Sequence, residues 1–184
     1  MFILYWSSFR HKWWKSYVLM LVVILGTAGV GKDTVMRYLS RDYGFHLVST
    51  LTSRTERPDD SNKTMSPVQF FPPNKYEVQE AFGNLYAQRK DELISAVESP
   101  RYFAVDVSCR YIDRFSIYTN TFVLLTLPTW EEHERRLEQA GRQERIGEVK
   151  KETELAERLV DHRLMRIVNE DSKRTAKIIA ESLE

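Results

Sequence analysis

Residues 26–34 read Gly-Thr-Ala-Gly-Val-Gly-Lys-Asp-Thr, which matches the G-x-x-x-x-G-K spacing of a phosphate-binding loop. The apolar run 18–25 comes directly before this loop, as a buried strand would, and a helical pattern that includes Val35 and Leu39 follows it. In this order, glycines let backbone N–H groups point at phosphate oxygens, while Lys32 and the helix N-terminus add positive charge. The pattern therefore predicts a phosphate-binding strand–loop–helix unit. The alternative is a glycine-rich turn that holds no ligand.

The residue after Lys32 is Asp33, where Ser or Thr is usual, and the hydroxyl follows one place later at Thr34. A carboxylate is a hard oxygen ligand, so Asp33 is a candidate to hold Mg²⁺ directly or through water. Asp33 also suits the first turn of a helix, in which case Thr34 would be the metal ligand. The sequence leaves both assignments open.

Composition limits the classes of function that need to be considered. A chain of 184 residues is expected to form one domain, and its net charge of +1 gives no general attraction to nucleic acid or membrane. The single cysteine, Cys109, excludes an internal disulfide and a cysteine-rich zinc site, and we interpret it as a small packing residue. A reducing, cytoplasmic setting is expected.

The first 17 residues are rich in aromatic and basic side chains and contain no acidic residue. Residues 18–25 are too few to span a bilayer, so we assign them to the first core strand. We interpret residues 1–17 as an extension. Either it contacts a membrane surface or a protein partner through its aromatic and basic residues, or it has no separate function.

Strands and helices alternate along the rest of the chain, which predicts an α/β fold with a parallel sheet. The region between residues 50 and 66 is polar and is expected to form a loop. Residues 129–132 resemble a capping box at the start of a helix. Strands are expected at 45–49, 68–71, 102–107 and 121–127 and from Met165 to Val168, with extended chain at 85–87. Helices are expected at 74–82, 89–97 and 110–115, from 130 to Gly141, after about Lys150 as far as about Leu164, and at the C-terminus.

The polar region contains a second group of residues suited to binding anions. Arg54 and Arg57 lie three residues apart, and guanidinium groups bind phosphate through two hydrogen bonds. Glu77 precedes the sequence Gly-Asn-Leu-Tyr at 83–86, and a carboxylate accepts hydrogen bonds from an N–H pair such as that of guanine. The alternative for the arginines is a solvated surface loop.

From about Leu21 to the C-terminus the chain resembles the guanylate kinase family. The landmarks occur in order: the phosphate-binding loop, Ser-Arg-x-x-Arg-Pro at 53–58, Gly-Asn-x-Tyr at 83–86, an apolar strand that ends in Asp106, and Ile-Val-Asn-Glu-Asp at 167–171. The resemblance implies the three-layer P-loop fold. It implies a core of 18–49 and 99–184 within a domain of 18–184, a nucleoside monophosphate (NMP)-binding insert at 50–98 and a lid at 140–150.

The resemblance also implies roles for individual residues. Arg54, Arg57 and Tyr86 would hold the phosphate of GMP, while Glu77 and Thr50 would bind guanine. Asp106 would lie beside the acceptor or a water-bound magnesium ion. The catalytic candidates at the transferring phosphoryl group are the cations Lys32, Arg142, Arg145 and Arg158 together with Asp106, and Arg136 is a further candidate.

Three departures from the family pattern affect the predicted base pocket. The usual Asp-x-Asp reads Asp106-Val-Ser108, residues Ala87 and Gln88 replace Gly and Ser/Thr, and the segment 68–71 lacks a tyrosine. The phosphate-binding residues are therefore largely kept while the base pocket is altered. Kinases of ribose 1,5-bisphosphate and some phage deoxynucleotide kinases also carry Gly-Lys-Asp in the loop.

The sequence predicts an enzyme that transfers a phosphoryl group from ATP, with Mg²⁺, to a nucleoside monophosphate, GMP or dGMP in the first place. The alternatives are another small phosphate acceptor, or a non-catalytic module that binds proteins; Gly31 and Lys32 argue against the module. No nucleic-acid partner is expected. The residues predicted to bind ATP are Gly26, Thr27, Ala28, Gly29, Val30, Gly31, Lys32, Asp33 and Thr34.

Overall fold

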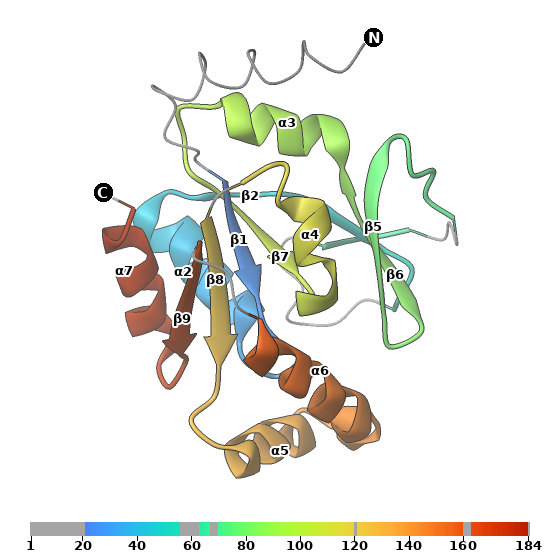
Figure 1. Cartoon of the computed structure of the whole chain (residues 1–184), viewed down its shortest axis with the longest axis vertical. Helices are drawn as coiled ribbons and strands as arrows, with labels where there is room; N and C mark the ends of the chain where they lie inside the picture. Colours follow the sequence, from blue (N-terminus) through green and yellow to red (C-terminus); the bar gives the residue numbers. More distant parts are fainter. Residues whose placement is uncertain (1–20, 56–62, 67–69, 120, 160–162, 184) are drawn as a thin grey trace, which may run out of the picture.

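The computed structural model describes residues 21–55, 63–66, 70–119, 121–159 and 163–183. Their central feature is a five-stranded sheet in the order β2-β7-β1-β8-β9, in which all neighbouring strands are parallel (Figure 1). The predicted α/β fold with a parallel sheet is confirmed. The strands are β1 (Leu21–Leu25), β2 (His46–Leu47), β7 (Phe103–Val107), β8 (Thr121–Thr126) and β9 (Leu164–Val168).

Helices cover both faces of this sheet and form three layers (Figure 1). Alternate side chains of β1 point to opposite faces, and all five are fully buried, which is why the strand is an unbroken apolar run. On one face the sheet packs on α2 (Lys32–Tyr43) and α7 (Ser172–Glu181). On the other face it packs on α3 (Lys90–Glu98), α4 (Ile112–Phe115) and α6 (Ile146–Arg158). Cys109 is buried within this second core, which agrees with its interpretation as a packing residue.

A second, smaller sheet is inserted between β2 and α3. Its strand order is β4-β3-β6-β5, with β5 and β6 joined as a hairpin through a turn at Gly83. The strands are β3 (Thr50–Thr52), β4 (Lys63–Met65), β5 (Tyr76–Ala81) and β6 (Asn84–Arg89). This small sheet occupies the position of the predicted insert at 50–98, beside the C-terminal ends of β1 and β7.

Two predictions about this insert were wrong. Residues 74–82 were expected to be helical, but β5 is a strand that pairs with β6 along its whole length. The region 50–66 was expected to be a loop, but it contains β3 and β4. These segments are polar because the sheet is small and one of its faces borders a polar cleft, so apolar periodicity is weak and pairing across the hairpin decides the conformation.

The remaining elements lie close to their expected positions. Thr129 caps α5 (Trp130–Gln139) by accepting a hydrogen bond from the Glu132 N–H, as predicted. Two short 3₁₀ helices are present, η1 (Cys109–Tyr111) and η2 (Gln143–Arg145). Helix α6 ends at Arg158, earlier than expected. In the predicted strand 68–71, residues 68 and 69 lie outside the described residues, and Phe70 and Phe71 are not in a strand. Residues 18–20 of the predicted first strand and the extension at 1–17 also lie outside the described residues. Within the described part of the chain, every helix is too short or too polar to cross a membrane.

Candidate functional site

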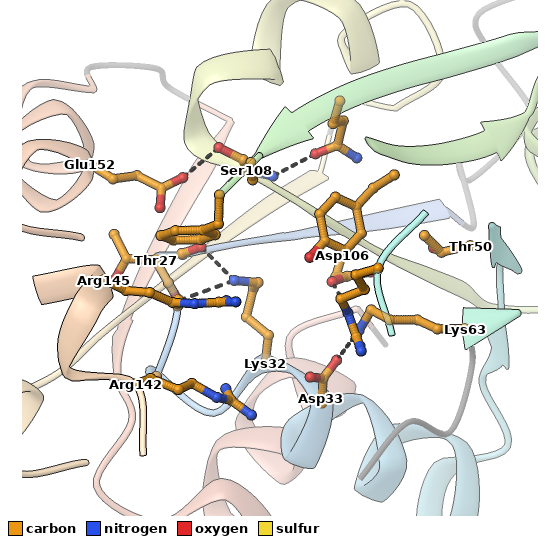
Figure 2. Close-up of a pocket in the computed structure, with 18 of the residues that line it drawn as sticks. Thr27, Lys32, Asp33, Thr50, Lys63, Asp106, Ser108, Arg142, Arg145 and Glu152 are labelled. Atoms are coloured by element: carbon orange, nitrogen blue, oxygen red, sulfur yellow. Dashed lines mark hydrogen bonds and ion pairs between the residues drawn. The ribbon is translucent and has the colours of Figure 1, made fainter. Parts of the chain in front are cut away.

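A polar cleft lies between the phosphate-binding loop, the small sheet and the start of α6 (Figure 2). It is at the C-terminal ends of β1 and β7, which is where ligands bind in open parallel sheets. Most of the predicted site residues line it. Those that do are Gly26, Thr27, Ala28, Gly29, Lys32, Asp33, Thr50, Arg54, Tyr86, Asp106, Arg142 and Arg145.

Other predicted residues lie elsewhere. Thr34 faces a different hollow beside Tyr38, and its hydroxyl accepts a hydrogen bond from Arg37 at 3.3 Å. Arg158 is exposed at the end of α6, outside the group that lines the cleft. Arg57 lies outside the described residues. Of the two candidate magnesium ligands next to Lys32, only Asp33 therefore borders the cleft.

The phosphate-binding loop is held in shape by glycines and by its own lysine. Gly31 has φ +91°, and a Cβ there would lie 2.6 Å from Asn169 Nδ2. A side chain at this position would therefore meet both backbone strain and a collision. Lys32 Nζ donates to the carbonyl oxygens of Gly26 and Thr27 at 2.6 and 3.1 Å. The ammonium group thus lies over the loop, where it would meet the oxygens of a bound phosphate.

Two buried residues support the loop from behind. Asn169, at the end of β9, donates through Nδ2 to the Val30 carbonyl at 2.6 Å and accepts from the Thr175 hydroxyl through Oδ1. His133 on α5 has its Nε2 2.6 Å from the Ala28 carbonyl. Because that carbonyl can only accept, Nε2 carries the hydrogen.

The His133 side chain packs under the loop and is only 3% exposed, although it lies on a helix rich in charged residues. Burial is the main reason that the pKa of His133 lies below its ordinary value, with Lys32 and Arg136 acting in the same direction. Arg136 itself binds Glu132 at 2.7 Å and reaches the Asn169 carbonyl at 3.4 Å. The neutral form of His133 is therefore the one that supports the loop.

Lys63 is a residue of the cleft that the sequence analysis missed. Its Nζ lies 2.5 Å from Asp33 Oδ1 and 3.6 Å from Asp106 Oδ2 (Figure 2). Burial favours the neutral amine, but the charges of Asp106 and Asp33 outweigh this and raise the pKa of Lys63. A basic residue in a polar segment gives no signal in the sequence. The strand pairing of β4 places it here.

The small-sheet wall of the cleft is lined by a chain of hydrogen bonds between uncharged groups, all running in one direction. The Ser108 N–H donates to Gln79 Oε1, Gln79 Nε2 donates to Gln88 Oε1, and Gln88 Nε2 donates to Thr50 Oγ1. Because a backbone N–H can only donate, it sets the orientation of both amides. The Ser108 hydroxyl donates to the buried Glu152 carboxylate. Gln88 and Ser108 were identified only as departures from a family pattern, and Gln79 and Glu152 were missed.

Glu77 lies on the same face of the small sheet, opposite Gln88, but it is not among the described residues that line the cleft. The Tyr118 hydroxyl donates to its carboxylate at 2.9 Å, and Lys90 Nζ lies 3.2 Å away. Burial, followed by the interaction with Glu77, raises the pKa of Tyr118. The carboxylate predicted to bind guanine is therefore engaged with two protein groups.

The two arginines of the predicted lid approach the cleft from the side opposite Lys63 (Figure 2). Arg142 precedes η2 and Arg145 ends it. The Arg145 guanidinium lies 4.5 Å from the centre of the Phe82 ring. Phe82 is at the tip of the β5–β6 hairpin and has φ +52°, which is uncommon for a bulky residue. This contact connects the predicted lid segment to the small sheet.

The carboxylates of Asp33 and Asp106 fit a divalent cation. Both supply hard oxygen donors at the edge of the phosphate-binding loop. Asp106 Oδ1 is buried and has no hydrogen-bond partner among the residues that the structure describes. Such an oxygen is suited to a cation or to its bound water.

Comparisons with known proteins support the fold. No protein-family model and no curated protein matches the sequence. Among solved structures, the chain is similar to guanylate kinase from Anaplasma phagocytophilum, with a TM-score of 0.65 and 19% identity over 91% of this chain and 86% of that one. It is also similar to a gluconokinase from Sinorhizobium meliloti 1021, with a TM-score of 0.50 and 14% identity over 91% and 97% of the two chains. The fold is that of P-loop kinases.

Proposed function

We propose that this protein transfers the γ-phosphoryl group of ATP to a small acceptor that carries a phosphate, with nucleoside monophosphates, and GMP or dGMP first among them, as the expected class. The observation that carries the proposal is the convergence of cations on one cleft. Lys32 comes from the phosphate-binding loop, Arg54 from the segment after β3, and Arg142 and Arg145 from the segment of η2 that leads into α6. This arrangement suits transfer of a phosphoryl group between two phosphates, because the cations neutralise the negative charge of the transferred group.

In this proposal the loop holds the phosphates of ATP through its N–H groups, with Lys32 turning from the loop carbonyls to the β- and γ-oxygens. Arg54 and Tyr86 hold the acceptor phosphate so that one of its oxygens attacks the γ-phosphorus in line. Arg142 and Arg145 neutralise charge on the transferred group and exclude water. Magnesium bound with ATP, held by Asp33 and Asp106, would neutralise part of the phosphate charge. No side chain acts as a nucleophile.

A different phosphate acceptor is the second candidate, and the uncharged amides on the small-sheet wall of the cleft favour it. Guanine presents N–H donors that call for carboxylate acceptors, but Glu77 is bound to Tyr118 and Lys90. The amides of Gln79 and Gln88 form the wall in its place. An acceptor with hydroxyl or carbonyl oxygens, such as another nucleotide or a sugar phosphate, suits such amides as well as guanine does.

The test is formation of ADP from ATP with a panel of acceptors: GMP, dGMP, AMP, CMP, UMP and ribose 1,5-bisphosphate. Transfer to GMP and dGMP above the rest would support the first assignment. Transfer to another member of the panel would support the second. A protein that forms no ADP with any acceptor, although it binds ATP, would favour the non-catalytic module. Lys177→Ala is a suitable control variant, because Lys177 is exposed on α7 and pairs only on the surface with Glu181.

A further inference from the structure

Lys63 has an unusual position for a charged residue. Its side chain is only 5% exposed, although it sits on β4, the edge strand of the small sheet. Strand pairing places Lys63 beside Thr50, and Thr50 beside Gln88, so all three belong to the same row of the sheet facing the cleft. The ammonium group crosses the cleft to the phosphate-binding side. A buried charge in such a place is retained only with compensating partners.

Both partners belong to the other part of the molecule. Asp33 is in the first turn of α2, and Asp106 is near the end of β7. The ammonium is 2.5 Å from the first carboxylate and 3.6 Å from the second. The pairing therefore joins the small sheet to the phosphate-binding loop through charge. It depends on the aspartate that stands where a phosphate-binding loop usually has Ser or Thr.

The Lys63 ammonium faces both carboxylates, and the positive charge of Arg54 is close enough to oppose the protonation of Lys63. In addition, Asp106 Oδ1 is buried and lacks a hydrogen-bond partner within the described ranges. A divalent cation would draw on the same two carboxylates. Lys63 and such a cation cannot both bind these carboxylate oxygens closely, because two positive charges a few ångströms apart repel each other.

We propose that Lys63 is a positioning residue that competes with the divalent cation for Asp33 and Asp106. Without nucleotide, Lys63 holds the two carboxylates and draws the small sheet onto the phosphate-binding loop. When the metal arrives with its nucleotide, Asp33 passes to the metal and the small sheet is released to receive the acceptor. Donor binding and the position of the acceptor site are thereby coupled. The inference rests on the proposed function in taking the metal to be the one that accompanies the donor.

Coupling of this kind is reciprocal, which gives two measurable consequences. Removing the lysine charge strengthens metal binding, because the competitor is gone. Adding the metal loosens the small sheet, because its ionic tie to the loop is lost. Both consequences concern the protein without acceptor and without turnover. They can be measured whether or not phosphoryl transfer has been detected.

The first measurement is binding of Mn²⁺ alone, followed by electron paramagnetic resonance, to the full-length protein and two variants. Lys63→Met keeps the length of the side chain and removes its charge, and Lys63→Arg keeps the charge. We expect Lys63→Met to bind Mn²⁺ about tenfold more tightly, within the usual range of coupling between sites, and Lys63→Arg to bind as the unmodified protein does. The double variant Lys63→Met with Asp33→Asn should lose the gain. Equal or weaker Mn²⁺ binding by Lys63→Met would overturn the inference.

The second measurement is hydrogen exchange in β3 and β4. Addition of Mn²⁺ should speed exchange there in the unmodified protein. In Lys63→Met exchange should be fast already and insensitive to the metal. Exchange that is unaffected by the metal in the unmodified protein would overturn the coupling. If Lys63→Met fails to fold, Lys63→Gln replaces it in both measurements. Absent kinase activity together with the Mn²⁺ shift would count against the proposed function alone.

Discussion

At the residue scale, the site depends on cations whose surroundings differ. Lys32 lies over the loop, where its ammonium group donates to two loop carbonyls, so its charge is close to the place where a phosphate would bind. Arg54 is 7% exposed, and its Nη1 donates to the Thr55 carbonyl at 2.7 Å, which orients the side chain before any acceptor binds. In the proposed reaction the first of these cations belongs to the donor side and the second to the acceptor side. Their substitution should therefore have separable effects.

Lys32→Ala should reduce phosphoryl transfer at least about a hundredfold, the usual effect of removing a group that stabilises charge in the transition state. The sheet and its helical layers should keep their stability, because among the described residues Lys32 donates hydrogen bonds to carbonyl groups of the loop alone. ADP formation measures the first effect and thermal unfolding the second, with Lys177→Ala as the control. Turnover at the unmodified rate with every acceptor would exclude the proposed reaction.

Arg54→Ala should raise the KM of the acceptor and leave the affinity for ATP nearly unchanged. Loss of a charge-assisted hydrogen bond costs roughly 1.5–3 kcal/mol, or about tenfold to a hundredfold in affinity. The effect should be similar for acceptors that differ in their base, because Arg54 is proposed to bind phosphate. Steady-state kinetics with two acceptors and a titration with ATP make the comparison. Weaker ATP binding with unchanged acceptor kinetics would reverse the assignment of the two sides.

At the element scale, the phosphate-binding loop is a short segment fixed by elements distant in sequence. Asn169 at the end of β9 and His133 on α5 hold its carbonyl groups. The loop packs so closely on Asn169 that Gly31 has no space for a side chain. The shape of the loop is therefore built by the contacts of α5, β9 and α7 as much as by the glycines.

Gly31→Ala tests this dependence, with Gly44→Ala as its matched control. Both glycines have positive φ, but a Cβ at Gly44 meets nothing within 4 Å, whereas at Gly31 it would lie 2.6 Å from Asn169 Nδ2. Strain alone costs about 1–2 kcal/mol at either position. We expect Gly31→Ala to lose more stability than Gly44→Ala in chemical denaturation, and to lose ATP binding as well. Equal losses with intact ATP binding would show that Asn169 does not confine the loop.

At the scale of the whole molecule, the buried His133 makes the stability of the fold depend on pH. The pKa of His133 is lowered in the folded state, chiefly by burial. Unfolding returns it toward its ordinary value of 6.5. The unfolded chain therefore binds more protons in the window just below pH 6.5, and the free energy of unfolding falls as the pH is lowered through that window.

His133→Asn should remove this component of the pH dependence, although its stability near pH 7.5 should also be lower because the packing under the loop changes. The measurement is chemical denaturation at several pH values between 5 and 7.5. His46→Asn is the control, because His46 is exposed on the edge strand β2. A pH dependence that is identical in His133→Asn and in the unmodified protein would contradict the assignment.

The sequence by itself was enough for the parallel sheet, the phosphate-binding loop and most of the residues around the cleft. These follow from local signals: an apolar run buried on both faces of a sheet, a glycine pattern, and a capping box at Thr129. Local signals of this kind depend on a few neighbouring residues, so they can be interpreted without knowing the fold.

Only the tertiary structure determined the small sheet and what it brings together. Strand β5 is polar and had been expected to be helical, because pairing across the hairpin outweighs its weak local preference. That pairing places Gln79 and Gln88 on the small-sheet wall of the cleft, while Glu77 interacts with Tyr118 and Lys90. Lys63 meets Asp33 and Asp106 across 30 and 43 residues of sequence, respectively. Topology and burial determine which distant charges Lys63 meets, and a local sequence pattern contains neither.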